Sequence, residues 1–186
     1  MLHIQGHTPE ADAAVVASCR PVAVTSACIR AAWHKLCGNY WLRDGRVSLK
    51  RKVHLVAIGS PHASLSEVRK IADLIDGRAR AADVHAIVCV GRAVRRQAVI
   101  EGVAARLEAA GITLMQDICW CSITVPYFPS EGVQVVLSNS GKYAHYGHAL
   151  HGCEMMLGSL AQCVHAMVTG DLMCVDPREL STETYR

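Results

Sequence analysis

Residues 135–146, which read VVLSNSGKYAHY, are the most informative stretch of the sequence. A short apolar run, typical of a buried strand, stops at Leu137 and gives way to hydroxyl groups, an amide, a cation, an imidazole and two phenols. Open α/β sheets bind their ligands where buried strands end, at the carboxyl edge of the sheet. An ordinary Ser/Asn/Gly turn with an exposed Lys142 is the alternative interpretation. The stretch therefore predicts either a ligand-binding strand end or a plain turn.

The composition is that of a well-filled domain. The 186 residues are 51% hydrophobic and 19% charged, with a formal net charge of +3. This mixed and mild charge argues against a nucleic-acid partner, and no run approaches the roughly 20 apolar residues of a membrane span. Residues 1–7 lack the pattern of a signal peptide. We therefore expect a cytoplasmic protein whose nine cysteines, an odd number, are thiols or metal ligands rather than disulfides.

Strand-like and helix-like segments alternate along the chain. Apolar runs predict strands at 21–25, 53–58, 84–90, 112–115, 133–137 and 154–157, with a strand fragment at 2–5. Capping residues and helical periodicity predict helices at 26–36, 64–75, 91–110 and 159–168, and the opening of another at 8–10. Residues 39–52 read as a polar loop. This alternation predicts an α/β fold, a parallel sheet with helices on both faces.

Two further expectations follow from the same pattern. Residues 1–170 form the α/β domain, and the polar residues 171–186 form a loose C-terminal tail. Arg92, Arg95 and Arg96 begin a helix and are expected on its exposed face.

Three of the predicted strands end in polar side chains. The segments are 59–64, 117–119 and 138–146. Because the carboxyl ends of parallel strands share one edge of a sheet, the three segments are expected to converge on one crevice.

Together and in this order, these strand ends resemble the large, catalytic subunit of the aconitase X family. The matching pieces are residues 56–67 (VAIGSPHASLSE), 117–119 (DIC), 137–146 (LSNSGKYAHY), 158–164 (GSLAQCV) and 169–170 (TG). The likeness runs from His3 to about Gly170 and corresponds to the C-terminal half of that subunit. It implies an aconitase-like three-layer architecture.

The resemblance implies a hydro-lyase, or dehydratase, acting on a small hydroxy acid such as 3-hydroxyproline or a phosphorylated mevalonate-type acid. Family members use an iron–sulfur cluster as a Lewis acid and need a small swivel domain, fused or as a separate subunit. Relative to the family the chain is truncated, so a swivel subunit and an N-terminal half-subunit are expected as partners. A non-catalytic anion-binding module, or a remnant without function, is the alternative.

Cys119 is the candidate metal ligand, because iron–sulfur clusters are held by thiolates. Cys121 lies two residues further on, and in an extended segment side chains two apart share a face, so both thiols could reach one metal. A small buried thiol is the alternative interpretation of Cys119.

The remaining candidate residues fall into two groups. Those expected to bind the substrate anion offer a cation, hydroxyl groups, an amide or an imidazole: Lys142, Ser138, Asn139, Ser140, Ser60, His62 and Ser64. Those expected to be catalytic are His145 and Tyr146, which shuttle protons or orient the anion, and Asp117, which orients a donor or holds the Cys119 loop. Ser64 also matches the capping-box spacing with Glu67, and the two roles are compatible.

Overall fold

The computed structural model describes residues 6–9, 11–37, 51–123 and 128–172. The chain divides into two compact units, residues 1–30 and 31–186. The first unit contains the helix α1 (Ala13–Ser18), and α2 (Ser26–Leu36) crosses the boundary between the units. No helix in the described ranges is both long and apolar enough to cross a membrane.

The second unit is built on a five-stranded parallel sheet, as the alternation of segments predicts. The strands are β1 (Leu55–Ile58), β2 (His85–Val90), β3 (Thr113–Gln116), β4 (Val135–Ser138) and β5 (Glu154–Leu157). They lie in the order β3-β2-β1-β4-β5, and every pair is parallel. The central strands β1 and β4 are buried along their whole length, which explains their continuous apolar runs.

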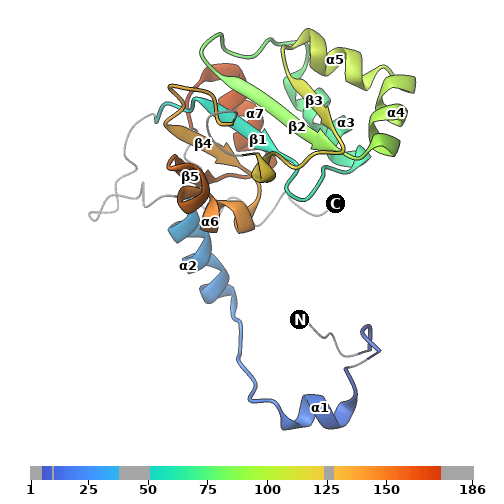
Figure 1. Cartoon of the computed structure of the whole chain (residues 1–186), viewed down its shortest axis with the longest axis vertical. Coiled ribbons are helices and arrows are strands. Elements are labelled where there is room, and N and C mark those ends of the chain that lie inside the picture. The colour runs from blue at the N-terminus through green and yellow to red at the C-terminus, as the bar shows by residue number, and fades with distance from the viewer. Residues whose placement is uncertain (1–5, 10, 38–50, 124–127, 173–186) are drawn as a thin grey trace. The chain divides into compact units, whose positions relative to one another are not determined.

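Helices cover both faces of this sheet (Figure 1). One face packs against α3 (Leu65–Ile75), α5 (Val103–Ala109) and α7 (Leu160–Thr169), and α4 (Arg92–Ile100) packs on α3 and α5. The other face carries a smaller apolar cluster built on Trp120 and on Tyr143 of α6 (Gly141–His151). The predicted fold class, with helices on both faces, is confirmed.

Three local predictions are wrong, and one helix was not predicted. Residues 91–110 are not one helix, because Gly102, at φ +72°, separates α4 from α5. Residues 21–25 form no strand; Val22 and Val24 are 83% and 72% exposed. The first helix begins at Ala13 rather than at 8–10. Residues 141–151 form the unpredicted helix α6.

Several predictions fall where the structure gives no description. These are the strand fragment 2–5, most of the polar loop 39–52 and the tail from residue 173. The domain boundary at residue 170 stays a prediction.

Candidate functional site

The order of the strands makes the carboxyl ends of β1 and β4 a topological switch point, the position that we call the crevice. From β1 the chain turns into α3 on one face of the sheet, and from the neighbouring β4 it turns into α6 on the opposite face. Two adjacent loops that leave in opposite directions open a gap between them, which is where doubly wound sheets bind ligands. Residues 59–64 form the loop after β1, the first loop, and residues 139–140 form the loop after β4, the third loop; the predicted segment 138–146 continues into α6 from residue 141.

The first loop is held against β2 by a close backbone approach. Gly59 has φ +98°, and a Cβ there would lie 2.3 Å from the carbonyl oxygen of Cys89. That carbonyl oxygen also accepts a hydrogen bond from the backbone N–H of Ala63 (2.9 Å). Ser60, between them, is buried, with 3% of its surface exposed. The loop therefore requires glycine at position 59 to place Ser60 at the strand end.

The loop after β3, residues 117–119, is the second loop, and it is fixed by Asp117, a residue with φ +57°. Its carboxylate accepts hydrogen bonds from the backbone N–H and from Nε of Arg92, both at 2.8 Å. The backbone hydrogen bond from Arg92 is the main cause that lowers the pKa of Asp117, so the group is a carboxylate near neutral pH. This arrangement favours the loop-holding role of Asp117 over proton transfer.

His62 connects the first loop to the second. Its Nε2 donates a hydrogen bond to the carbonyl oxygen of Ile118 (3.2 Å), which requires the tautomer protonated at Nε2. The imidazole is exposed at this junction. His62, one of the residues predicted to bind the substrate anion, therefore touches the Cys119 loop directly.

Two thiols meet Ser60 at the crevice. Cys119 donates a hydrogen bond from Sγ to Oγ of Ser60 at 3.5 Å. Residues 120–122 form a short 3-10 helix rather than the expected extended segment, yet Cys121 still interacts with Cys119 and Ser60. The sequence prediction that both thiols reach one point is consistent with these contacts, although the assumed backbone is wrong.

The chemistry of Cys121 links the two sides of the crevice. Burial alone would raise the pKa of this thiol, but hydrogen bonds with Cys119, Ser60 and Ser122 and the positive charge of Lys142 outweigh it, and the net pKa is lowered. Lys142 lies in the first turn of α6, on the far side of the switch point, and is exposed. Its ammonium is therefore near enough to favour a thiolate in the second loop.

The third loop uses its hydroxyl groups for local structure. Ser138, fully buried, accepts a hydrogen bond at Oγ from the backbone N–H of Ser140 (3.2 Å). Ser140 is the N-cap of α6 and accepts from the N–H of Tyr143 (3.2 Å). Both hydroxyl groups keep a proton to donate. Asn139, between them, is half-buried.

Other predicted site residues lie apart from the thiols. Ser64 forms the complete capping box of α3 with Glu67, so the capping prediction is confirmed. His145 and Tyr146 lie on exposed parts of α6, with their rings 5.1 Å apart. No described contact joins these two side chains to Cys119, and their catalytic role stays a prediction.

A buried aromatic cluster beneath the crevice was not predicted. Trp120 and Tyr143 touch, with ring centroids 3.8 Å apart, and the ring of His151 lies 5.5 Å from that of Tyr143. Indole Nε1, the phenol oxygen and both imidazole nitrogens are buried and have no hydrogen-bond partner in the described part of the chain. The aromatic residues next to Cys119 and Lys142 were the only sequence signal available.

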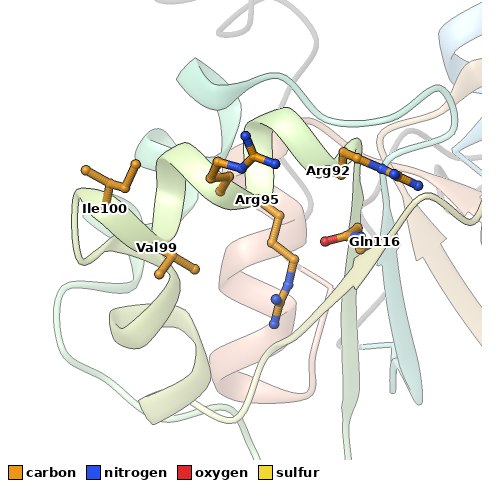
Figure 2. A pocket seen from close by; sticks show the side chains of 6 residues that line it. Arg92, Arg95, Val99, Ile100 and Gln116 are labelled. Atoms are coloured by element: carbon orange, nitrogen blue, oxygen red, sulfur yellow. The ribbon is translucent and has the colours of Figure 1, made fainter.

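Within the described ranges, no three His, Cys, Asp or Glu side chains are placed to hold a metal ion. A pocket lies elsewhere, between α4 and the end of β3 (Figure 2). Its lining residues are Arg92, Arg95, Arg96, Val99, Ile100 and Gln116.

Comparisons with known proteins agree with the resemblance found in the sequence. Residues 53–169 match the family model of the aconitase X third domain. The chain is 36% identical over 170 residues to a cis-3-hydroxy-L-proline dehydratase of Hypocrea jecorina and 37% identical over 175 residues to one of Pseudomonas aeruginosa. Each alignment covers 91% of this chain and 28% of the relative, so the chain spans less than a third of their length.

The fold agrees with a solved structure. The crystal structure of Thermococcus kodakaraensis aconitase X, in its holo form, superposes with a TM-score of 0.61 at 21% identity. The superposition covers 77% of this chain and 33% of that one. At this identity the likeness concerns the fold alone.

Proposed function

Because the chain belongs to the aconitase X family, we propose that it forms part of a hydro-lyase that removes water from a small hydroxy acid. One observation carries the proposal: Cys119, Cys121 and Ser60 interact at the switch point of the sheet, within the electrostatic reach of Lys142. Dehydration needs an anchor for the acid and a means of helping hydroxide to leave. An ammonium beside a pair of thiols offers both kinds of group at one place.

The proposed substrate is of the 3-hydroxyproline type. Support comes from the 36% and 37% identity to the two cis-3-hydroxy-L-proline dehydratases over most of this chain. A phosphorylated mevalonate-type acid is the second candidate. Lys142 would bind the carboxylate in either case, and the hydroxyl groups of Ser60, Ser138 and Ser140 would add neutral donors.

An iron–sulfur cluster is the proposed cofactor, and the residues present fit part of its ligand set. Cys119 and Cys121 share hydrogen bonds with each other and with Ser60, and the lowered pKa of Cys121 favours the thiolate that iron binds. When bound, such a cluster would supply a Lewis acid to the leaving hydroxyl group. The described residues provide no third ligand at this place, so the other ligands are proposed to come from the rest of the enzyme.

The other residues are assigned from their positions. Asp117 keeps the Cys119 loop on the first residue of α4. His145 and Tyr146 are retained as proposed proton carriers, since both are exposed and open to a partner domain. A swivel subunit and an N-terminal half-subunit are the proposed partners, because the chain spans only 28% of its two relatives.

Iron loading tests the cofactor. Because the other ligands are proposed to come from the rest of the enzyme, the chain is joined to the remaining parts of the Pseudomonas aeruginosa dehydratase; we expect this protein to become brown, with visible absorbance, when it is purified anaerobically with iron and sulfide. Cys119→Ser and Cys121→Ser should lose the absorbance, whereas Cys28→Ser, at an exposed thiol in α2, should keep it. A colourless protein that contains no iron would favour the non-catalytic anion-binding module.

A chimera tests the reaction. Residues 53–169 would replace the matching segment of the Pseudomonas aeruginosa dehydratase, and loss of water from cis-3-hydroxy-L-proline would be assayed. We expect activity, and we expect Lys142→Ala to weaken substrate binding by about 1.5–3 kcal/mol, the value of a charge-assisted hydrogen bond. Lys70→Ala, on the exposed side of α3, is the matched control. A folded, iron-loaded chimera without activity would contradict the proposal.

A further inference from the structure

The pocket beside α4 is lined by a stripe of arginines. Arg92 stands three and four residues before Arg95 and Arg96, so it is close to each of them on the helix surface, and all three side chains line the pocket. Gln116, the last residue of β3, faces them across the gap (Figure 2). The sequence predicted only an exposed helix face here. Arg92 and Arg96 are exposed and Arg95 is half-buried, which agrees with that prediction. The three cations line one pocket, and like charges three or four residues apart destabilise one another unless an anion is present.

Among the described residues, nearby carboxylates neutralise only part of the positive charge of these three arginines. Arg92 is held by Asp117 through two 2.8 Å hydrogen bonds. Arg95 reaches Glu108 only at 3.4 Å, and the side chains of the two residues are 36% and 53% exposed, so this ion pair is weak. Arg96 has no ion-pair or hydrogen-bond partner among the described residues.

The next acid along the helix is committed elsewhere. Glu101 accepts two hydrogen bonds from Arg69 of α3, at 2.6 and 2.8 Å, and another from Gln97. The pairing with Arg69 lowers the pKa of Glu101 to about 2, so this acid stays ionised and bound. The guanidinium groups of Arg95 and Arg96 can therefore bind an anion if one weak surface ion pair, that of Arg95 with Glu108, breaks.

The rest of the pocket wall is apolar. Val99 and Ile100 are 55% and 70% exposed, one turn beyond the arginines on the same side of α4. Large aliphatic side chains this exposed, next to a cationic stripe, suit a ligand with an anionic end and an apolar body.

We propose that this pocket binds a small molecule that carries a phosphate dianion and a short apolar part. Arg95 and Arg96 would take the phosphate oxygens with their planar donor groups, and the amide of Gln116 would add a neutral donor. Two positive charges match a dianion. Val99 and Ile100 would cover the apolar part. The site is separate from the proposed dehydratase crevice, since Lys142 and Ser60 do not line it.

Titration of the whole chain, followed by ¹H–¹⁵N NMR, tests the site. The probes are inorganic phosphate and phenyl phosphate. We expect saturable shifts confined to α4 and Gln116, and tighter binding of phenyl phosphate because of its ring. Arg96→Gln should weaken binding about tenfold, the effect of losing one charge-assisted hydrogen bond. Arg106→Gln, which removes an arginine paired with Asp73, should leave binding unchanged.

A charge-matched pair of variants excludes a general electrostatic effect. Glu108→Gln removes the carboxylate that competes for Arg95 and should tighten binding several-fold. Asp73→Asn makes the same change in net charge beside Arg106 and should not. Equal effects of the two variants, or shifts spread over the whole surface, would overturn the proposal.

Two other probes distinguish the sources of the anion. Shifts at α4 with a polyglutamate peptide but not with either phosphate would point to an acidic protein segment and overturn the proposal. If the protein sediments with phosphatidic-acid vesicles but does not bind soluble phenyl phosphate, the pocket binds a lipid headgroup instead. This result would also overturn the proposal. Lys142→Ala should leave binding at α4 intact, so failure of the proposed dehydratase is separable from failure here.

Discussion

Substitution of Gly59 by alanine tests how the first loop of the crevice is built. A Cβ at this position would lie 2.3 Å from the carbonyl oxygen of Cys89, whereas ordinary carbon–oxygen contacts are about 3.3 Å or longer. The oxygen cannot retreat freely, because Cys89 is paired with Met115 in β3 and its carbonyl group accepts the N–H of Ala63. The new methyl group must therefore displace the loop that carries Ser60.

The expected cost has two parts, and a second glycine separates them. Gly59 has φ +98° and Gly77 has φ +72°. Alanine at either position must adopt a positive φ, which lowers the free energy of unfolding by about 1–2 kcal/mol. At Gly77 nothing lies within 4 Å of the added Cβ. At Gly59 the clash adds about 1–3 kcal/mol, typical of overpacking against a rigid neighbour. We therefore expect Gly59→Ala to be less stable than Gly77→Ala by about 2 kcal/mol.

Urea unfolding followed by circular dichroism measures this difference. In a protein of this length, about 2 kcal/mol also corresponds to a difference in Tm of roughly 4–8 °C between the two variants. Alkylation of Cys119 should become faster only in Gly59→Ala, because this thiol loses its contact with a displaced Ser60. Equal stability of the two variants would refute the argument that close backbone packing positions the first loop.

Three further predictions concern the residues around the crevice. Burial lowers the pKa of His151, so below about pH 6.5 the imidazole is protonated more in the unfolded chain than in the folded one. The folded state is therefore most stable above about pH 6.5 and loses stability as the pH falls below this value. His151→Leu should flatten the decline of the urea midpoint between about pH 7.5 and 5.5. Lys142→Met should raise the pKa of Cys121, because it removes a charge that lowers it, and the midpoint of iodoacetamide alkylation against pH should move upward at Cys121 alone. Asp117→Asn should speed amide hydrogen exchange in the first turn of α4 and in the Cys119 loop without changing exchange in α7, and an unchanged pattern would show that the carboxylate does not hold this loop.

The sequence predicts the fold well where one physical signal dominates. The apolar runs locate all five strands, and Ser64 and Ser159 locate the starts of two helices because each caps its first turn with a partner three residues on. Prediction fails where signals compete. Residues 141–151 are rich in Gly, Tyr and His, which are poor helix formers, yet they form α6 because Tyr143, Gly147 and His151 bury a stripe against the sheet.

The sequence predicts which loops share one edge of the sheet but not the contacts between them. The topology of a parallel sheet brings its strand ends to one edge, so the placing of the segments that carry Ser60, Cys119 and Lys142 at that edge follows from the alternation of strands and helices. The sequence could not show that Asp117 is committed to Arg92, because that pairing depends on a turn with positive φ. The pocket beside α4 could not be predicted either. The periodicity of the sequence predicts a helix there, but it does not show how the helix packs against β3.

The arrangement of the crevice depends on alternation between buried and reactive residues. Trp120 is fully buried and lies between Cys119 and Cys121, while Tyr143, 1% exposed, follows Lys142 directly. The two rings touch beneath the crevice, with their centroids 3.8 Å apart, so one aromatic contact fixes the backbone under both the thiols and the ammonium. Groups anchored through one rigid contact keep their separation when the surface loops move. The anchor therefore explains how a 3-10 turn and the first turn of a helix, from opposite sides of the switch point, hold their polar groups within electrostatic reach of each other.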